Sequence, residues 1–221
     1  IAIAAYSYMA LVPVIIPLVV KLTCSKKELM INMKEQDKLY PDKMEIKNMR
    51  AVKIIFPIAV TTIVAIFVPT AVPLIGMLMF GNLLRECKVL DSLSSAAQNI
   101  LTPLISLLLG LSMAPLMKGD HIMRKETLMI MAFGLMAFVL GTVSGVVFIK
   151  VANLFLPKDK KVNPLIGGAG LSAFPMSSRV VEKVGIESDK QNHLLPFALG
   201  ANVAGQIGSV MAGGILLSLL K

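Results

Sequence analysis

The sequence has no tryptophan, few aromatic residues and only two cysteines, and each shortage excludes a class of protein. Cys24 and Cys87 lack the spacing of a metal-binding pair, and two cysteines cannot build a disulfide framework. With 5% aromatic residues and no nucleic-acid-binding motif, the net charge of +9 does not indicate a nucleic-acid partner. The HExxH, GxSxG, P-loop and Met-Lys-Met biotin-attachment motifs are also missing, so any chemistry must use sparse polar groups.

Charged residues are scarce as well, and they are unevenly spread. They make up 16% of the chain, against about a quarter in an average soluble domain. Apolar residues make up 56%, and the mean hydropathy is +0.78. The charges gather between apolar runs, as they do in membrane proteins, because a charge at bilayer depth is costly. We therefore predict an all-α polytopic membrane protein, with the lipid bilayer as its surroundings.

The apolar runs predict the membrane-spanning helices. Four runs have the length and composition of one crossing each: residues 1–20, 99–117, 127–149 and 194–220. The polar residues 85–98 predict an amphipathic connector. The chain begins with Ile1 inside an apolar run, and we expect it to be the C-terminal part of a longer chain forming one integral membrane domain over 1–221.

Two further apolar runs are interrupted by glycine and proline. Residues 54–84 would reach about 46 Å as one helix, against a hydrocarbon core of about 30 Å. Proline removes a backbone donor, so Pro69 and Pro73 predict a helix, a break and a second helix. Residues 163–180 are similarly broken and predict a discontinuous or re-entrant helix. Paired broken segments indicate a transport site near the middle of the membrane.

The polar segment 21–53 is the longest loop between apolar runs and the most basic one. Basic loops mark the cytoplasmic side of membrane proteins, so we expect this segment to be cytoplasmic. Its residues Lys26 to Lys38 predict a helix on the surface.

Polar groups inside the broken run and the last run are the candidate site, because polar side chains at membrane depth are expensive. They are Asn163, Gly167, Gly168, Gly170, Ser172, Ser177, Ser178, Arg179, Asn202 and Gln206. Neutral oxygens of this kind, with carbonyls freed by unwinding, suit Na⁺. The alternative is that they only pack and hydrogen-bond between helices, with Arg179 snorkelling to water. Tyr6 and Tyr8 have an equally plain interpretation as interfacial aromatic residues.

Four motifs carry a family resemblance. They are AAYSYMALVP at 4–13, GNLLRE at 81–86, NPLIGGAGLSAFPMSSRVVEKVG at 163–185 and GANVAGQIGS at 200–209. In sequence, order and spacing they resemble the beta subunit of the sodium-pumping biotin-dependent decarboxylases, which act on oxaloacetate, methylmalonyl-CoA, glutaconyl-CoA or malonate. The resemblance covers essentially the whole chain and corresponds to the C-terminal half of the family's chain.

The resemblance implies a mechanism and a set of partners. In that family a soluble partner moves CO₂ onto biotin, and the beta subunit decarboxylates the carboxybiotin and uses the free energy to export Na⁺, consuming a proton from outside. The cofactors implied are Na⁺ and carboxybiotin supplied by a partner subunit. The partners implied are biotin-carrying and carboxyltransferase subunits and a small membrane subunit, in a bacterial inner membrane, and a homo-oligomer is compatible with this. The fold implied is an inverted-repeat transporter, of which this chain holds mainly the second repeat.

The resemblance also implies roles for individual residues. The Na⁺ path falls on Asn163, Gly167, Ser172 and Asn202. Arg179 would hold the carboxylate of carboxybiotin, since a guanidinium suits a planar anion. Tyr8, or its neighbour Tyr6, would relay a proton or bind the ion, and Ser172 joins Arg179 and Tyr8 as a catalytic residue.

One departure from the family pattern limits what this chain is expected to do. The family also relies on an aspartate upstream of the tyrosine motif, in a segment that is absent here. None of the acidic residues present lies in a deep apolar run. We therefore expect the chain to be inactive on its own, with an incomplete Na⁺ site.

Two other functions stay open. An Na⁺-coupled secondary transporter of carboxylates fits the residues equally well, and it would not depend on a biotin-carrying partner. A non-catalytic membrane anchor would not need Asn163, Ser172, Arg179 or Asn202, so their substitution would leave turnover intact. The acid that is decarboxylated is read by the soluble partner and cannot be assigned from this chain.

Overall fold

The computed structural model describes residues 2–40, 48–116 and 119–220. Within these ranges the regular elements are all helical. The chain forms two units: residues 1–43 with 119–206, and residues 44–118 with 207–221. The all-α prediction is confirmed for the described part of the chain.

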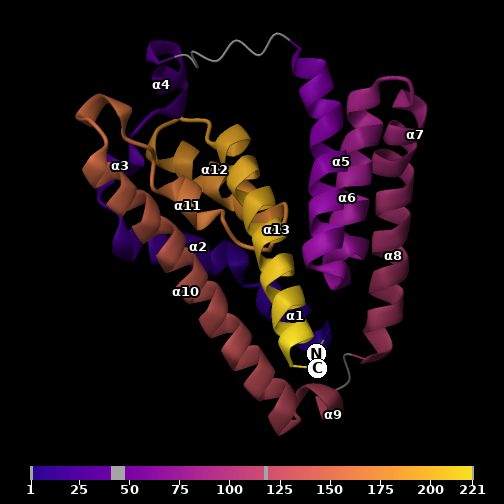
Figure 1. Ribbon diagram of the computed structural model, residues 1–221. Helices are drawn as coiled ribbons and strands as arrows, with labels where there is room; N and C mark the ends of the chain where they lie inside the picture. Colours follow the sequence, from indigo (N-terminus) through magenta and orange to yellow (C-terminus); the bar gives the residue numbers. More distant parts are fainter. Residues whose placement is uncertain (1, 41–47, 117–118, 221) are drawn as a thin grey trace. The chain divides into compact units, whose positions relative to one another are not determined.

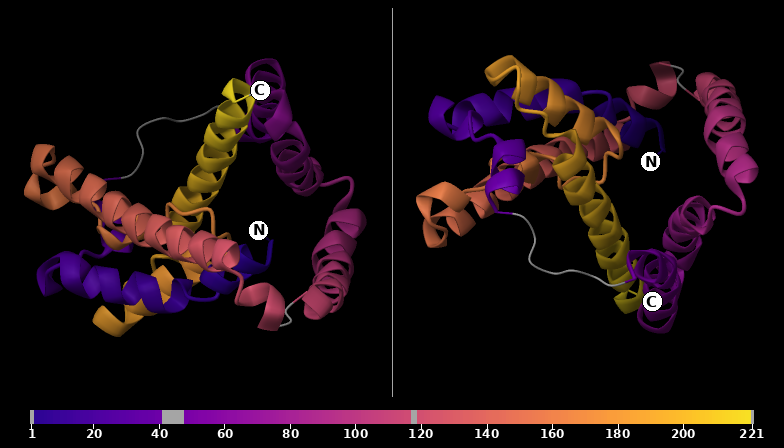
Figure 2. Two further views of the ribbon diagram at one scale, coloured as in Figure 1. Left: turned by 90° about the horizontal axis from the view of Figure 1, so that it is seen from below. Right: turned by 90° about the horizontal axis from the view of Figure 1, so that it is seen from above.

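The first unit is built around one long helix, α10 (Lys125–Phe155). Its other helices are α1 (Ala2–Met9), α2 (Val12–Thr23), α3 (Lys26–Leu29), α4 (Met33–Leu39), α9 (Gly119–Ile122), α11 (Leu165–Gly168), α12 (Met176–Ser188) and the first part of α13 (Leu195–Leu219). A short 3-10 turn, Lys158–Lys160, follows α10. Helices α2 and α10 lie alongside each other (Figures 1 and 2), with α11 packed on α10 and α12 on α2. The core between them includes Ile16, Val146, Leu165 and Val181, all buried.

Residues 1–20 do not form one continuous span, which corrects the prediction. A turn at Ala10 and Leu11 separates α1 from α2. Pro13 is the second residue of α2, and proline is suited to the first turn of a helix because it lacks an amide hydrogen. The proline therefore marks the start of a second helix, and α2 has only 12 residues.

The basic segment contains two short helices, so the single helix predicted over Lys26 to Lys38 is wrong. Ser25 begins α3 with a capping box: its hydroxyl accepts from the Glu28 amide, and the Glu28 carboxylate accepts from the Ser25 amide. Asn32 caps α4, its Oδ1 accepting from the amides of Lys34 and Glu35. A second cap in mid-segment breaks the helix. Residues 41–47 of the predicted 21–53 loop lie outside the described residues.

The second unit contains a helical hairpin. Its elements are α5 (Met49–Phe67), the 3-10 turn Pro69–Ala71, α6 (Val72–Cys87), α7 (Asp91–Ala96), the π-helical turn Ala97–Leu101, α8 (Thr102–Met113), the 3-10 turn Ala114–Leu116 and the second part of α13. Lys53 at the start of α5 pairs with Glu86 at the end of α6, with Nζ and Oε2 3.4 Å apart. The predicted helix–break–helix in residues 54–84 is confirmed, and α6 runs back along α5 (Figure 1).

Residues 85–98, predicted as an amphipathic connector, are mostly helical. Helix α6 continues to Cys87, and α7 begins at Asp91. The link is short because Lys88 adopts a left-handed conformation, with φ of 55°, that ends α6 within one residue.

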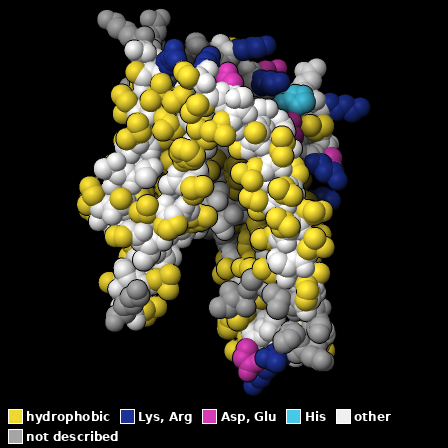
Figure 3. Space-filling view, turned by 90° about the vertical axis from the view of Figure 1, so that its right-hand side faces the viewer, with side chains coloured by type: hydrophobic (Ala, Val, Ile, Leu, Met, Phe, Trp, Pro, Cys, Tyr) yellow, Lys and Arg dark blue, Asp and Glu magenta, His cyan; other side chains and the backbone are white. Residues whose placement is uncertain are grey.

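Four stretches of helix in the described residues are long and apolar enough to cross a membrane: 49–67, 91–113, 125–155 and 195–219. Many large hydrophobic side chains on them are exposed, including Phe67, Leu108, Phe148 and Leu216. Figure 3 shows hydrophobic side chains covering the helices on one face, with Lys and Arg side chains gathered toward its upper and lower ends. This distribution is typical of a multi-pass membrane protein.

Candidate functional site

The broken segment of the first unit is the most irregular part of the described chain. The four-residue helix α11 ends at Gly168, and α12 begins at Met176. Between them the backbone is not helical, and the Phe174–Pro175 peptide bond is cis. The predicted discontinuous helix in residues 163–180 is confirmed. Unwinding frees carbonyl groups, and inside a membrane protein such groups need other partners.

Glycines allow the broken segment to approach its neighbours closely. A Cβ on Gly145 of α10 would overlap the carbonyl oxygen of Gly167. Similarly, a Cβ on Gly205 of α13 would overlap the carbonyl of Gly170. Both pairs bring one backbone directly against another, which only glycine permits. The broken segment therefore contacts α10 and the first part of α13.

Two side chains bind the carbonyls that unwinding frees. The hydroxyl of Ser177, which is fully buried, lies 3.2 Å from the carbonyl oxygens of both Ala169 and Ala173. Asn202 Nδ2 of α13 donates to the carbonyl of Leu171 over 2.5 Å. The unwound stretch is thus held from α12 by a serine and from α13 by an asparagine.

The side-chain oxygen of Asn202, Oδ1, is the strongest indication of a binding site. Asn202 is fully buried, and its Oδ1 faces no hydrogen-bond donor of the described protein. A buried acceptor without a partner costs about 1–3 kcal/mol. Leu171 bonds to Asn202, and the exposed Ser172 follows it in the chain. Amide, carbonyl and hydroxyl oxygens are the neutral donors that suit an alkali cation.

Asn163 lies at the other end of the broken segment and is also fully buried. Its Nδ2 donates to the carbonyls of Leu29 and Ile31, and its Oδ1 accepts from the amide of Leu165. None of the hydrogen bonds between described residues joins Asn163 to Asn202. The structure thus ties the two predicted ion-path asparagines to different parts of the unit.

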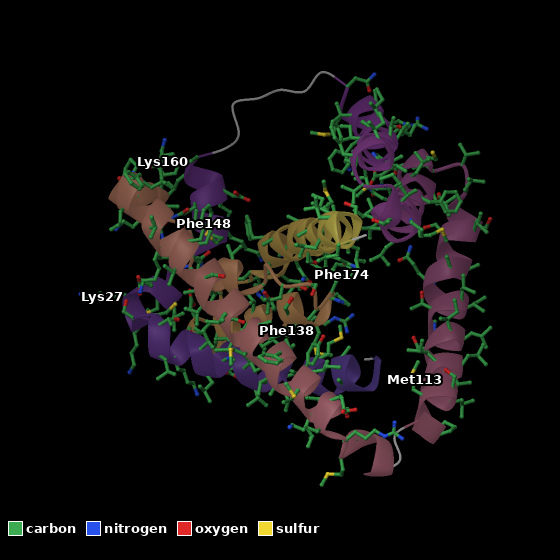
Figure 4. All side chains as sticks on the ribbon, turned by 60° about the horizontal axis from the view of Figure 1, so that its bottom comes forward. Lys27, Met113, Phe138, Phe148, Lys160 and Phe174 are labelled. Atoms are coloured by element: carbon green, nitrogen blue, oxygen red, sulfur yellow. The ribbon has the colours of Figure 1, made fainter. Side chains whose placement is uncertain are left out.

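Tyr8 packs on α10. Its ring centroid lies 5.3 Å from that of Phe138, which Figure 4 labels on α10. A Cβ added to Gly134 would overlap the Tyr8 ring. Gly134 therefore leaves the space that the tyrosine ring fills. The side chain of Tyr6 lies outside the described residues.

Arg179 lies in the first turn of α12, and its side chain is exposed. It takes part in none of the ion pairs found among the described residues. A guanidinium in this state is free to bind an anion from outside the chain.

Charged groups link α3 to α10 at the end of the unit where Figure 4 labels Lys27 and Lys160. Lys150 Nζ lies 3.2 Å from Glu28 Oε1 and donates to the Thr23 carbonyl over 2.7 Å. Burial raises the pKa of Glu28, but hydrogen bonds from Ser25 and the ammonium of Lys150 outweigh it and hold the pKa below 4.5. Burial raises the pKa of the neighbouring Cys24 thiol above 9.0.

Sequence reasoning missed two contributors to the site. Asn192 is fully buried and shares the Leu29 and Ile31 carbonyls with Asn163. It lies in a polar loop without hydrophobic periodicity, so no sequence signal distinguishes it. Gly205 was also missed, although the Gly-rich sequence 200–209 indicates close packing there.

Comparisons with known proteins place the chain in a family. Residues 1–220 match the family model of the Na⁺-transporting oxaloacetate decarboxylase beta subunit. The oxaloacetate decarboxylase beta chain of Haemophilus ducreyi is 44% identical over 222 residues, covering 100% of this chain and 48% of the relative. The oxaloacetate decarboxylase beta chain of Klebsiella pneumoniae is 45% identical over 218 residues, covering 98% of this chain and 48% of the relative.

A third relative is named for a different substrate, methylmalonyl-CoA. The methylmalonyl-CoA decarboxylase subunit beta of Propionigenium modestum is 44% identical over 219 residues, covering 99% of this chain and 53% of the relative. The chain thus spans about half the length of the curated relatives that it matches. Because the family model covers almost every residue, the chain belongs to the family of Na⁺-transporting oxaloacetate decarboxylase beta subunits.

Proposed function

We propose that this chain forms part of the membrane subunit of a sodium-pumping decarboxylase, which decarboxylates carboxybiotin and couples this to Na⁺ export across a bacterial inner membrane. The observation that carries the proposal is the buried Oδ1 of Asn202, which faces no donor of the described protein while its amide nitrogen binds the unwound segment. A pump needs an ion site that a local movement can form and break. A site at an unwound helix meets this need.

The Na⁺ path follows the broken segment. Asn202 and Ser172 supply side-chain oxygens, and Gly167 lets the backbone lie against α10. Asn163 has both amide hydrogens bound, but Oδ1 keeps one lone pair beside the bond from Leu165. Asn163 therefore contributes to the path through Oδ1 or by shaping the start of α11.

The decarboxylation step uses the exposed cation of α12. Carboxybiotin, presented by a biotin-carrying partner, supplies the N–C bond that breaks to release CO₂, leaving a nitrogen that takes up one proton. Arg179 binds the carboxylate with its planar guanidinium. Ser172, which follows Leu171 in the chain, donates a hydrogen bond from its hydroxyl to the same carboxylate. Tyr8 relays the proton or binds the ion. The carboxyltransferase subunit and a small membrane subunit complete the complex.

Na⁺-dependent turnover of the full-length complex tests this function. The rate of decarboxylation is measured against Na⁺ concentration for wild type, Asn202→Ala and the control Asn99→Ala, an exposed asparagine of the second unit. We expect Asn202→Ala to raise the Na⁺ concentration for half-maximal rate roughly tenfold, because the ion site loses one oxygen ligand; tenfold corresponds to about 1.4 kcal/mol of binding free energy. The control keeps the wild-type value.

Two outcomes favour the other functions. Turnover that is independent of Na⁺ and unchanged by Asn202→Ala supports a membrane anchor. Na⁺ movement without any biotin-carrying partner supports a secondary transporter of carboxylates.

A further inference from the structure

Two buried asparagines from distant parts of the sequence bind the same two carbonyl groups. Asn163 Nδ2 lies 3.0 Å from the Leu29 oxygen and 2.9 Å from the Ile31 oxygen. Asn192 Nδ2 lies 3.4 Å and 2.9 Å from the same two oxygens. Both side chains are fully buried. The link between α3 and α4 is thus held by two amides at once.

The side-chain oxygen atoms of Asn163 and Asn192 extend this contact to two different helices, α11 and α4. Asn163 Oδ1 accepts from the amide of Leu165, the first residue of α11, over 3.0 Å. Asn192 Oδ1 accepts from the amide of Met33, the first residue of α4, over 3.4 Å. The backbone N–H of Asn163 in turn donates to the Met33 sulfur over 3.4 Å. One continuous set of hydrogen bonds therefore connects the start of α4 with the start of α11.

Burial makes this set sensitive to the loss of one member. A polar network inside a protein fixes geometry when every member is satisfied, and it loosens when one is removed. Without Asn192, the Met33 amide loses its acceptor, and Asn163 is the one remaining described side chain that donates to the carbonyls of Leu29 and Ile31. Asn163 would then be bound to a mobile link instead of a fixed one.

We infer that Asn192 is a positioning residue for the Na⁺ path, fixing Asn163 and the first turn of α11 through the carbonyls of Leu29 and Ile31. Asn192 does not contact the ion in this account. The inference rests on the proposed function, since it assumes that the broken segment binds Na⁺. It adds a residue that lies outside the four family motifs.

Stabilisation by Na⁺ measures ion binding apart from turnover. The full-length subunit is purified, and its melting temperature is followed as NaCl replaces KCl at constant ionic strength. A ligand that binds only the folded state raises the melting temperature, so the curve gives the Na⁺ concentration for half-maximal stabilisation. We expect Asn192→Ala to raise this concentration roughly three- to tenfold, the range of one lost hydrogen bond. The control Gln191→Ala, an exposed amide of the same loop, keeps the wild-type value.

Two further variants keep the inference testable if Asn192→Ala does not accumulate. Asn192→Asp keeps the acceptor for Met33 but loses the two donors, and we expect a shift in the same direction. In the double variant Asn163→Ala/Asn192→Ala, we expect the fold-increase in the Na⁺ concentration for half-maximal stabilisation to be smaller than the product of the fold-increases of the two single variants. The reason is that both residues act on the same carbonyls.

The possible failures are distinguishable. A lower melting temperature in Asn192→Ala or Asn192→Asp, with an Na⁺ dependence within twofold of wild type, makes Asn192 merely structural and overturns the inference. Wild-type protein that Na⁺ stabilises no more than K⁺ overturns the proposed Na⁺ site, and this inference falls with it.

Discussion

Gly145 of α10 and Gly167 of α11 pack backbone against backbone, and neither has room for a side chain. A Cβ on either residue would overlap the carbonyl oxygen of the other. The longest helix of the described chain therefore packs closely against the broken segment at the last turn of α11.

Gly145→Ala is expected to push α11 away from α10. Because the added methyl group meets backbone rather than a flexible side chain, we expect a loss of about 1–3 kcal/mol in folding stability. The melting temperature of the full-length subunit in detergent measures this. Gly110→Ala in α8 is the matched control, since a Cβ there meets no described atom within 4 Å. Equal melting temperatures for the two variants contradict the backbone contact.

Ser177→Ala is expected to loosen the unwound stretch. Its hydroxyl bonds to Ala169 and Ala173, so its loss costs about 1 kcal/mol and raises the Na⁺ concentration for half-maximal decarboxylation. Ser106→Ala is the control, because the Ser106 hydroxyl bonds only within its own exposed helix, to the Thr102 carbonyl. An Na⁺ dependence identical in Ser177→Ala and wild type argues against this role.

Gly134→Ala is expected to displace the Tyr8 ring. The new methyl group would occupy the space of the ring, so the ring must move from Phe138. If Tyr8 relays a proton or binds the ion, this variant and Tyr8→Phe lower Na⁺-coupled turnover together. Tyr8→Phe keeps the ring and removes only the hydroxyl, so normal turnover in Tyr8→Phe removes the proposed role of Tyr8.

Glu28 gives a pH-dependent contribution to stability. Its pKa is lower in the folded protein than the ordinary value of 4.5, so its stabilisation is complete above that value and is lost as the pH falls through the folded pKa. We expect Glu28→Gln to lower the melting temperature at pH 7, with a difference from wild type that shrinks as the pH falls below 4.5. Glu35→Gln, at an exposed residue of α4, is the control. A difference that stays constant as the pH falls from 7 to well below 4.5 contradicts the ion pair with Lys150.

The length and composition of the apolar runs predicted α10, α13 and both broken segments, but not the division of residues 1–20 into two helices. The run 194–220 became α13 within one residue at each end, because a long apolar run leaves no other way to satisfy the backbone in lipid. The prolines of residues 54–84 and the glycines of residues 163–180 located both breaks. Local chemistry decides these features, so the sequence is sufficient for them.

Contacts between residues far apart in the chain could not be predicted from the sequence. The turn at Ala10 and Leu11 divides a run whose hydropathy is continuous, and Asn192 looks like any polar loop residue. Their roles depend on which elements pack together. The tie between Asn163 and the α3–α4 link has the same origin, since no spacing relates residues 130 or more positions apart.

Donor-driven uptake of ²²Na⁺ is the decisive test of the proposed pump. The full-length subunit and its partners are placed in sealed vesicles, a carboxylated-biotin donor is added, and wild type is compared with Asn163→Ala, Asn202→Ala and Arg179→Ala. We expect uptake that requires the donor and is abolished by Arg179→Ala, and that is strongly reduced by Asn163→Ala and Asn202→Ala at the Na⁺ concentration that gives half-maximal uptake in wild type. Uptake that proceeds without the donor, or that all three variants retain in full, would contradict the proposed pump.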